Sequence, residues 1–361
     1  MLARDHRRTG VKGIGGLLGV GLIVLACSSP AASSPPAATG SAPSAAASQA
    51  APPSAEAKTL EIAYLSFAVA NSYDAPMLAA AQAAAAAGNA KLTVFDANLD
   101  PAAQTKQLQD AVASGKYDAI ITQPLYGAGL VEDVKKAIAA GIAVGNIDQV
   151  LGSDMTTPNS QVEGLSANVA FVPSELGRKI GELVVAACDD LKANPCNVGY
   201  IWSVKAAALD IALKEAFDKA IAGHPEIKIV SDTGESFYTT ALGLKAAQDI
   251  VAAHPDVSVI VSADQAITGA VTAVKDIKDT VRLVGYGGGA IALQGIASGE
   301  RFGTVMQAPA TEGRLGTEQL IQAIRTGTIM PGVDPLAALP EGGVVTKANV
   351  DTFLPLAEWP G

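Results

Sequence analysis

The sequence predicts an α/β protein made of two Rossmann-like lobes, and three observations support this class. Short β-branched runs alternate with helical patterns over most of the chain, as expected for βαβ units with right-handed crossovers. The alternation restarts after about Ser166. Residues 108–123 and 247–263 repeat the same order of helix, turn and strand, each with a Gln-Asp pair near its start. The repeat indicates two related lobes, each built on a parallel sheet.

The first 26 residues are typical of a bacterial export signal. The basic stretch ARDHRRTGVKG precedes IGGLLGVGLIVLA, which is shorter than the roughly 20 residues that a membrane-spanning helix needs. The tripeptide Val-Leu-Ala directly before Cys27 resembles a lipobox, in which cleavage leaves a lipidated cysteine at the mature N-terminus. We therefore expect a lipid anchor on Cys27. The alternative is a soluble secreted protein whose Cys27 thiol is unmodified.

Residues 27–58 are expected to form a disordered tether. The stretch SSPAASSPPAATGSAPSAAASQAAPPSAEAK holds almost no apolar side chain larger than alanine. Such a segment cannot bury enough surface to offset the entropy of ordering its backbone.

Composition and charge limit the function of the remaining residues, about 300 in number, which exceed the size at which a single core usually splits. The chain is 49% hydrophobic but only 4% aromatic, so its core consists mainly of Ala, Val, Ile and Leu. Its formal net charge is −10, which disfavours binding to nucleic acid or to an anionic lipid surface.

The first lobe is predicted to hold four strands, each apolar enough for a parallel sheet that is covered on both faces. The strands are EIAYLSF, KLTVFDA, YDAIITQ and IAVGNID. The helices between them are expected at 75–89, 100–115 and 129–141. Asp100 as N-cap, Pro101 at the first helical position and Gly115 beyond the end set the limits of the second helix.

The second lobe repeats this scheme. Helices are expected at 174–188, 207–223 and 239–254, with strands at 197–202, 226–232 and 257–263. Strands at 281–287 and 303–307 and a helix at 311–327 follow. Because ligands of open parallel sheets bind outside the carboxyl ends of the strands, two such lobes facing each other would form a cleft.

The order and spacing of five stretches after Lys58 carry a resemblance to a known family. The stretches are IAYLSFAVANSYDAPM, DAIITQP, IAVGNID, AHPDVSVIVSAD and GTVMQAP. Together they resemble type I periplasmic binding proteins of the ribose-binding kind, the solute-binding subunits of ABC sugar importers. The resemblance implies a multi-crossing hinge, a first lobe at 59–166 plus 308–336, and a second lobe at 167–307 plus 337–361.

The resemblance also implies a cleft in which aromatic rings sandwich a sugar and amides and carboxylates bind its hydroxyl groups. The residues at matching positions are Asn71, Tyr73, Asp74, Gln123, Asp148, Phe237 and Gln307. Structural roles stay open for some of them: Asn71 or Asp74 could cap the helix that starts near Pro76, and Phe237 could belong to the core.

Several positions depart from the family pattern. Leu213 and Gln149 stand where arginines are common, Ala263 and Asp264 where the family has Asn-Asp, and Gly287 where it has an aspartate. Many of the charged residues that usually bind a pentose or hexose in this family are therefore missing. We expect a small neutral sugar or polyol, with Gln149 and Asp264 still among its contacts.

Three further aromatic residues near predicted strand ends are candidates for reshaping the pocket. They are Tyr126, Trp202 and Tyr286. Of these, Trp202 at the end of NVGYIW is the expected ligand contact.

Enzymatic, metal and cofactor sites are not expected. The sequence holds no G-x-S-x-G, H-E-x-x-H or GK[ST] motif. The glycine-rich GYGGGA at 285–290 lacks dinucleotide spacing and fits a tight turn from strand to helix. His224 and His254 each precede a proline at a predicted helix end, and no Cys/His/Asp/Glu cluster has metal-ligand spacing.

These features predict a monomeric solute-binding lipoprotein outside the cytoplasm, anchored to the cell membrane. Its lobes would close over the ligand and deliver it to the permease of an ABC importer. The alternative is a sensor that uses the same clamp to signal to a chemoreceptor or histidine kinase.

The two cysteines after Cys27 are predicted to form a disulfide. Cys188 and Cys196 lie in ACDDLKANPCNVGY, where a helix ends and the next strand begins. Paired cysteines of exported proteins persist as disulfides, and this connection is short enough for the Cα separation of roughly 4.4 to 6.8 Å that a bridge needs. The alternative is a pair of ordinary buried thiols.

Overall fold

The structure, a computed structural model, describes residues 58–361. The predicted export signal, the lipidation site Cys27 and nearly all of the predicted tether lie outside the described residues.

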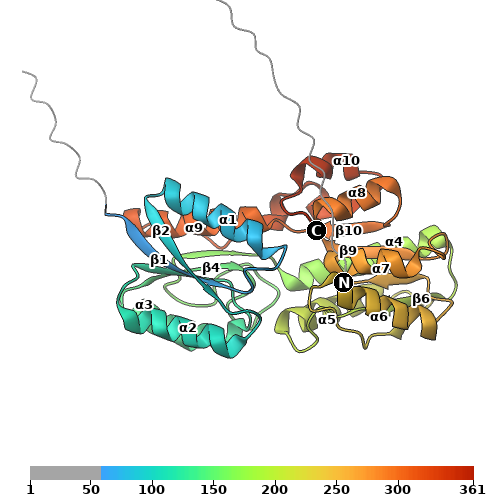
Figure 1. The fold of residues 1–361 in the computed structure, drawn as a ribbon, viewed down its shortest axis with the longest axis horizontal. Coiled ribbons are helices and arrows are strands. Elements are labelled where there is room, and N and C mark those ends of the chain that lie inside the picture. Colours follow the sequence, from blue (N-terminus) through green and yellow to red (C-terminus); the bar gives the residue numbers. More distant parts are fainter. Residues whose placement is uncertain (1–57) are drawn as a thin grey trace, which may run out of the picture. The chain divides into compact units, whose positions relative to one another are not determined.

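The first lobe is a five-stranded parallel sheet in the order β2-β1-β3-β4-β5. Its strands are β1 (Leu60–Ser66), β2 (Ala90–Asp96), β3 (Ala119–Thr122), β4 (Ala143–Asp148) and β5 (Ala167–Ala170). As Figure 1 shows, α1 (Asp74–Ala87) and α9 (Pro309–Thr326) cover one face, and α2 (Pro101–Ser114) and α3 (Gly127–Ala139) cover the other. Every residue of the central strand β3 is buried, as its apolar sequence predicts.

The second lobe is a six-stranded sheet in the order β11-β10-β9-β8-β6-β7. Its strands are β6 (Cys196–Tyr200), β7 (Ile227–Ser231), β8 (Val259–Val261), β9 (Arg282–Gly287), β10 (Gly303–Met306) and β11 (Val344–Thr346), the last antiparallel to β10. Its helices are α4 (Pro173–Leu191), α5 (Ala208–Ile221), α6 (Thr240–Ala253), α7 (Asp264–Val274), α8 (Ala290–Ser298) and α10 (Val350–Phe353). Short 3₁₀ turns lie at Pro335–Ala338, Pro340–Gly343 and Leu354–Leu356.

Helix caps read from the sequence are present in the structure. The Asp100 carboxylate accepts hydrogen bonds from the amides of Ala102 and Ala103 at 2.8 and 3.2 Å. Gly115 ends the same helix with φ of +61°, a conformation that costs glycine little. These local contacts set α2 within a residue of its predicted limits.

The division of the chain differs from the expected one at one place. β5 lies beyond the expected boundary at residue 166, yet it pairs with β4 and completes the first sheet. β11 and the helices α7, α8 and α10 were also not predicted. Four residues, ANVA, are too few to show a strand pattern, and the pairing with β4 comes from the fold.

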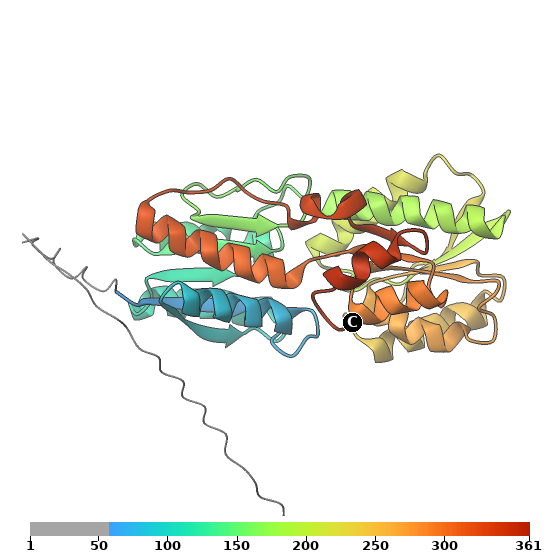
Figure 2. The same cartoon turned by 90° about the horizontal axis from the view of Figure 1, so that it is seen from above.

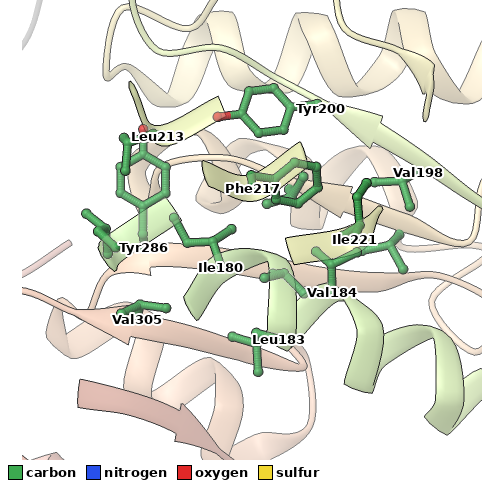
Figure 3. Close-up of a cluster of buried hydrophobic side chains, with 14 of the residues drawn as sticks. Ile180, Leu183, Val184, Val198, Tyr200, Leu213, Phe217, Ile221, Tyr286 and Val305 are labelled. Atoms are coloured by element: carbon green, nitrogen blue, oxygen red, sulfur yellow. The ribbon is translucent and has the colours of Figure 1, made fainter. Parts of the chain in front are cut away.

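The core of the second lobe depends on a close approach of α4 and α5. A Cβ at Gly177 would lie 2.2 Å from the backbone oxygen of Leu213, so only glycine allows this contact. Figure 3 shows Ile180 and Val184 of α4 near Phe217 of α5, in one buried cluster. Leu213 and Tyr286 belong to the same cluster and also reach the cavity described below.

The chain crosses between the two sheets after β5, after β10 and after α9. Figure 2 shows the C-terminal segment, in red, returning beside the start of α9, where Glu358 accepts a hydrogen bond from the Thr311 amide at 2.8 Å. The disulfide prediction is confirmed: Cys188 and Cys196 are bridged, with Cα atoms 5.8 Å apart. Within residues 58–361, no helix has the length and hydropathy of a membrane span.

Candidate binding site between the lobes

A cavity lies where the carboxyl ends of the strands of both sheets face each other. It holds about 490 Å³ of empty space, its opening to solvent included. Seven of the residues predicted to contact a ligand line it: Asn71, Tyr73, Asp74, Gln123, Asp148, Gln149 and Gln307. All of them except Gln307 follow β1, β3 or β4 or end these strands, because parallel strands bring their carboxyl ends to one edge of the sheet.

Gln123 connects the two carboxylates of the first lobe. Its Nε2 donates to the Asp148 Oδ2 at 3.0 Å and also to the Asp74 carboxylate. Its Oε1 accepts from the Phe67 amide at 3.0 Å. The Gln104 amide in turn donates to the Gln123 carbonyl at 2.8 Å. Gln123 therefore has a fixed orientation before any ligand arrives.

Tyr73 joins a third carboxyl group to this network. Its hydroxyl lies 3.5 Å from the Asp148 Oδ1 and 3.3 Å from the Glu312 Oε2. Asn71 accepts a hydrogen bond from the Tyr73 amide at 2.8 Å, which holds the loop before α1 in place. Asn71 therefore does not cap the helix directly, because α1 begins at Asp74. Its side chain instead closes a turn just before α1.

Burial sets the charge of the three carboxyl groups. It raises the pKa of Asp148 to about 6, despite hydrogen bonds from Gln123, Tyr73 and other neighbours that favour the ionised form. The pKa values of Asp74 and Glu312 rise well above their usual range, first through burial and then through the charge on Asp148. At neutral pH the cluster therefore keeps Asp148 as its main anion.

The second lobe presents a more apolar wall. This side is lined by Leu176, Leu209, Leu213 and Ala263. Leu213 stands at the position where the resemblance implies that an arginine is common. The Tyr286 hydroxyl is held by the Ser203 Oγ at 2.6 Å. The two lobes thus differ in chemistry: carboxyls and amides on the first, mostly hydrocarbon on the second.

Two glutamines interrupt the apolar wall. Gln265 and Gln307 are each only 6% exposed and line the cavity. Within the described part of the chain, neither side-chain amide has a hydrogen-bond partner. Buried amides are normally paired, so both are available to a ligand.

Trp359, the third residue from the end of the sequence, forms part of the cavity wall. Its Nε1 donates to the Gly287 carbonyl at 2.9 Å, and its ring meets Tyr73 edge to face at 5.5 Å. A Cβ at Gly287 would lie 2.7 Å from the indole, and the φ of +129° also favours glycine. The glycine that replaces the family's aspartate therefore makes room for Trp359.

Phe237 lies outside this cavity, in an outer one of about 860 Å³ that includes open solvent. The outer cavity shares Phe67, Gln149, Leu209 and Tyr238 with the inner one. Tyr238 meets Phe67 edge to face at 6.3 Å across the two lobes. Phe237 is 42% exposed, so it is neither a core residue nor a wall of the inner cavity.

Two predicted contacts, Trp202 and Asp264, are not brought to either cavity. Trp202 is buried against Tyr200, with ring centroids 5.4 Å apart, and its Nε1 donates to the Asp232 carbonyl at 2.7 Å. Asp264 accepts hydrogen bonds from the Gly288 amide and the Thr304 hydroxyl, both at 2.7 Å, and pairs with Arg301. Trp202 thus turns toward the core, and Asp264 joins the network around Gly288 and Thr304.

Sequence reasoning missed several residues of the site. Phe67 ends the predicted strand EIAYLSF, and Gln265 follows VSVIVSAD directly, so both positions carried a signal. Trp359 and Glu312 reach the site from the C-terminal segment and from α9, and no local pattern marks them. No group of acidic, histidine or cysteine side chains suited to a metal ion is present among residues 58–361.

Comparison with known proteins places these features in context. A family model described as a periplasmic binding protein domain matches residues 62–328. The ribose import binding protein of Bacillus subtilis (strain 168) is 25% identical over 229 residues, which cover 63% of this chain and 70% of that protein. The D-allose-binding periplasmic protein of Escherichia coli (strain K12) is 25% identical over 240 residues, covering 62% and 71%.

Solved structures share the fold. An ABC transporter solute binding protein from Mycobacterium smegmatis with bound glycerol gives a TM-score of 0.69 at 24% identity, covering 84% of this chain and all of the other. One from Bacillus halodurans C-125 with bound myo-inositol gives 0.71 at 19% identity, covering 84% and 99%. The matched family and the curated relatives are described as binding proteins, which confirms the expectation of a binding protein rather than an enzyme.

Proposed function

The chain belongs to the periplasmic binding protein family, and on that premise we propose that it is the solute-binding protein of an ABC importer. It binds a small sugar or polyol between its lobes and delivers this ligand to a membrane permease. The lobes close because a ligand that contacts both of them at once favours the closed state by the difference in its affinity for the two states.

The observation that carries this proposal is the cavity itself. Carboxyl groups line the side of the first lobe, aliphatic side chains line mainly the second, and amide groups and aromatic rings come from both. A sugar or polyol has the matching surfaces, because its hydroxyl groups donate and accept hydrogen bonds while its C–H groups are apolar. A concave site with a few convergent polar groups in an apolar wall is the usual form of a small-molecule site.

Names of similar proteins support the ligand class and the transport role. One relative is a ribose import binding protein, and another is a D-allose-binding periplasmic protein. Two proteins of the same fold hold glycerol and myo-inositol. All four ligands are small polyhydroxylated molecules.

The proposed location follows from the N-terminal sequence. The mature chain acts outside the cytoplasm as a monomer, held at the membrane by a lipid on Cys27 and separated from it by the tether at 27–58. A lipid-anchored domain on such a tether stays within reach of the permease.

A thermal-shift screen of pentoses, hexoses, polyols and cyclitols tests the binding role. A ligand that binds only the native state raises the melting temperature by mass action, and calorimetry then gives its affinity. The full-length lipoprotein in detergent and the chain from residue 59 should respond alike. Absence of any response across the panel would contradict sugar or polyol binding.

Delivery to a permease is tested separately in cells. Deleting the gene should abolish uptake of the ligand found in the screen, and the wild-type gene should restore it. A Cys27→Ala variant should restore uptake poorly. Unchanged uptake in the deletion strain would contradict the transport role while leaving ligand binding intact.

A further inference from the structure

The charged groups around the cavity are all acidic. Asp74 and Asp148 line it and Glu312 stands behind Tyr73, while no Lys, Arg or His is among the lining residues, all of which lie in the described part of the chain. The outer cavity adds Asp210 and likewise has no basic side chain in its lining. Arg301 is buried but pairs with Asp264, and neither of these two lines either cavity.

The donors near the carboxylates are already in use. The Gln123 amide serves both Asp74 and Asp148, and the Tyr73 hydroxyl lies between Asp148 and Glu312. These neutral donors orient the carboxylates but leave the negative charge uncompensated. Burial raises the pKa of Asp148 to about 6, and an ammonium group placed against this carboxyl would lower its pKa and favour the ionised form.

Aromatic rings surround the same space. Six of them line the cavity, in a chain whose aromatic content is only 4%: Phe67, Tyr73, Phe171, Tyr238, Tyr286 and Trp359. The face of an aromatic ring attracts a cation, more strongly where water is excluded. An enclosed carboxylate beside several aromatic rings is therefore able to bind an ammonium group.

Gln265 and Gln307 offer a ligand further polar contacts. Both side chains are more than nine-tenths buried, line the cavity and have no hydrogen-bond partner among the described residues. An amide both donates and accepts, which matches hydroxyl groups. A simple alkylammonium ion would leave these two amides unpaired.

We propose that the physiological ligand is an amino sugar or aminocyclitol, whose protonated amine binds Asp148 while its hydroxyl groups bind Gln265 and Gln307. This inference rests on the proposed function and replaces the expectation of a neutral ligand by that of a cationic one. The amine lies on the side of the first lobe, and the less polar face of the ring packs on Leu209 and Leu213 of the second. The net charge of −10 and the acidic outer cavity attract such a ligand.

The test compares matched trios of probes at pH 7.5 by calorimetry. Each trio holds a parent compound, the analogue with one hydroxyl replaced by an amine, and the N-acetylated amine, which is neutral. Suitable sets are D-glucose with D-glucosamine and N-acetyl-D-glucosamine, the D-galactose series, and myo-inositol with an amino-deoxy-inositol. In at least one trio the amine should bind about tenfold or more tighter than both neutral members, because charge-assisted hydrogen bonds are roughly twice as strong as neutral ones.

Variants assign the effect to the carboxylate. In Asp148→Asn the preference for the amine should fall to about threefold or less, whereas the exposed Asp110→Asn should keep the wild-type ratio. If Asp148→Asn does not fold, the wild-type protein serves instead: its preference for the amine should fall as the pH is lowered from 7.5 to 5, through the pKa of about 6 of Asp148. A tenfold preference that persists in the folded Asp148→Asn protein would overturn the role of Asp148.

The outcomes separate this inference from the proposed function. Neutral parents that bind as tightly as their amines in every trio would overturn the amine and leave sugar or polyol binding in place. No binding by any member of any trio, or by any other sugar or polyol, would overturn both.

Discussion

Single residues at the cavity adopt backbone conformations that local sequence does not favour. Asp148 in the first lobe has φ of +67°. In the second lobe the consecutive residues Phe237 and Tyr238 have φ of +47° and +53°. Left-handed conformations are uncommon for residues other than glycine and tend to occur at functional sites. Here they place a carboxylate and two aromatic rings at the cavities, which the surrounding contacts must stabilise.

Tryptophan fluorescence distinguishes the tryptophan that lines the cavity from the tryptophan that is packed in the core. Ligand binding should change the emission of Trp359, which lines the cavity, and not that of Trp202, which is packed on Tyr200. The signal should therefore vanish in Trp359→Phe and persist in Trp202→Phe when each is titrated with a ligand from the screen. The opposite pattern would place Trp202 at the ligand.

At the scale of elements, close packing of helices and one covalent bond hold the second lobe together. Gly177 and Gly181 let α4 approach α5, and the disulfide joins the end of α4 to the start of β6. The disulfide therefore connects the helix that follows the first crossing to β6, the strand that lies between β8 and β7.

Removing the disulfide should lower the stability of the second lobe. The Cys188→Ala, Cys196→Ala double variant should lose up to about 3 kcal/mol, because the closed loop is shorter than the 15 residues for which that value is expected. Urea unfolding of the oxidised wild type and the double variant measures the difference, and reduced wild type is the control for lost side-chain packing. Equal free energies for oxidised and reduced wild type would contradict a stabilising role.

At the scale of the whole molecule, buried acids make stability depend on pH. Burial raises the pKa of Asp148 to about 6 and that of Asp210 to about 7, whereas an unfolded aspartate titrates near 3.9. The folded state thus holds protons that the unfolded state has already released. The stability that these bound protons contribute to the folded state is fully present below about pH 4. It is lost as the pH rises through the pKa values of the folded protein.

The ligand-free protein should therefore be less stable at pH 8 than at pH 5. Asp210→Asn keeps one oxygen to accept from the Ser203 amide and places an NH2 group that can donate to the Tyr238 hydroxyl oxygen, and it should reduce this loss by roughly 2 to 3 kcal/mol. Urea unfolding at the two pH values measures it, with the exposed Asp110→Asn as control. A loss of the same size in Asp210→Asn would show that Asp210 is not responsible.

The sequence by itself determined the features that depend on neighbouring residues. Alternating strand and helix patterns, the caps of α2 and the short spacing of Cys188 and Cys196 all act over a few positions, so the α/β class, most elements and the disulfide were predictable. The positions of Asn71, Gln123 and Asp148 at the cavity follow because they lie just after or at the ends of predicted parallel strands.

Only the tertiary structure decided which distant side chains meet. Trp359 and Glu312 join the site from segments far along the chain, since Gly287 leaves room for the indole and α9 packs against α1. Trp202 and Asp264 stand at predicted strand ends, yet their side chains turn to the core and to Gly288. Asp264 and Gln265 open α7, and successive side chains of a helix point about 100° apart, so a shift of one position exchanges a buried network for the cavity.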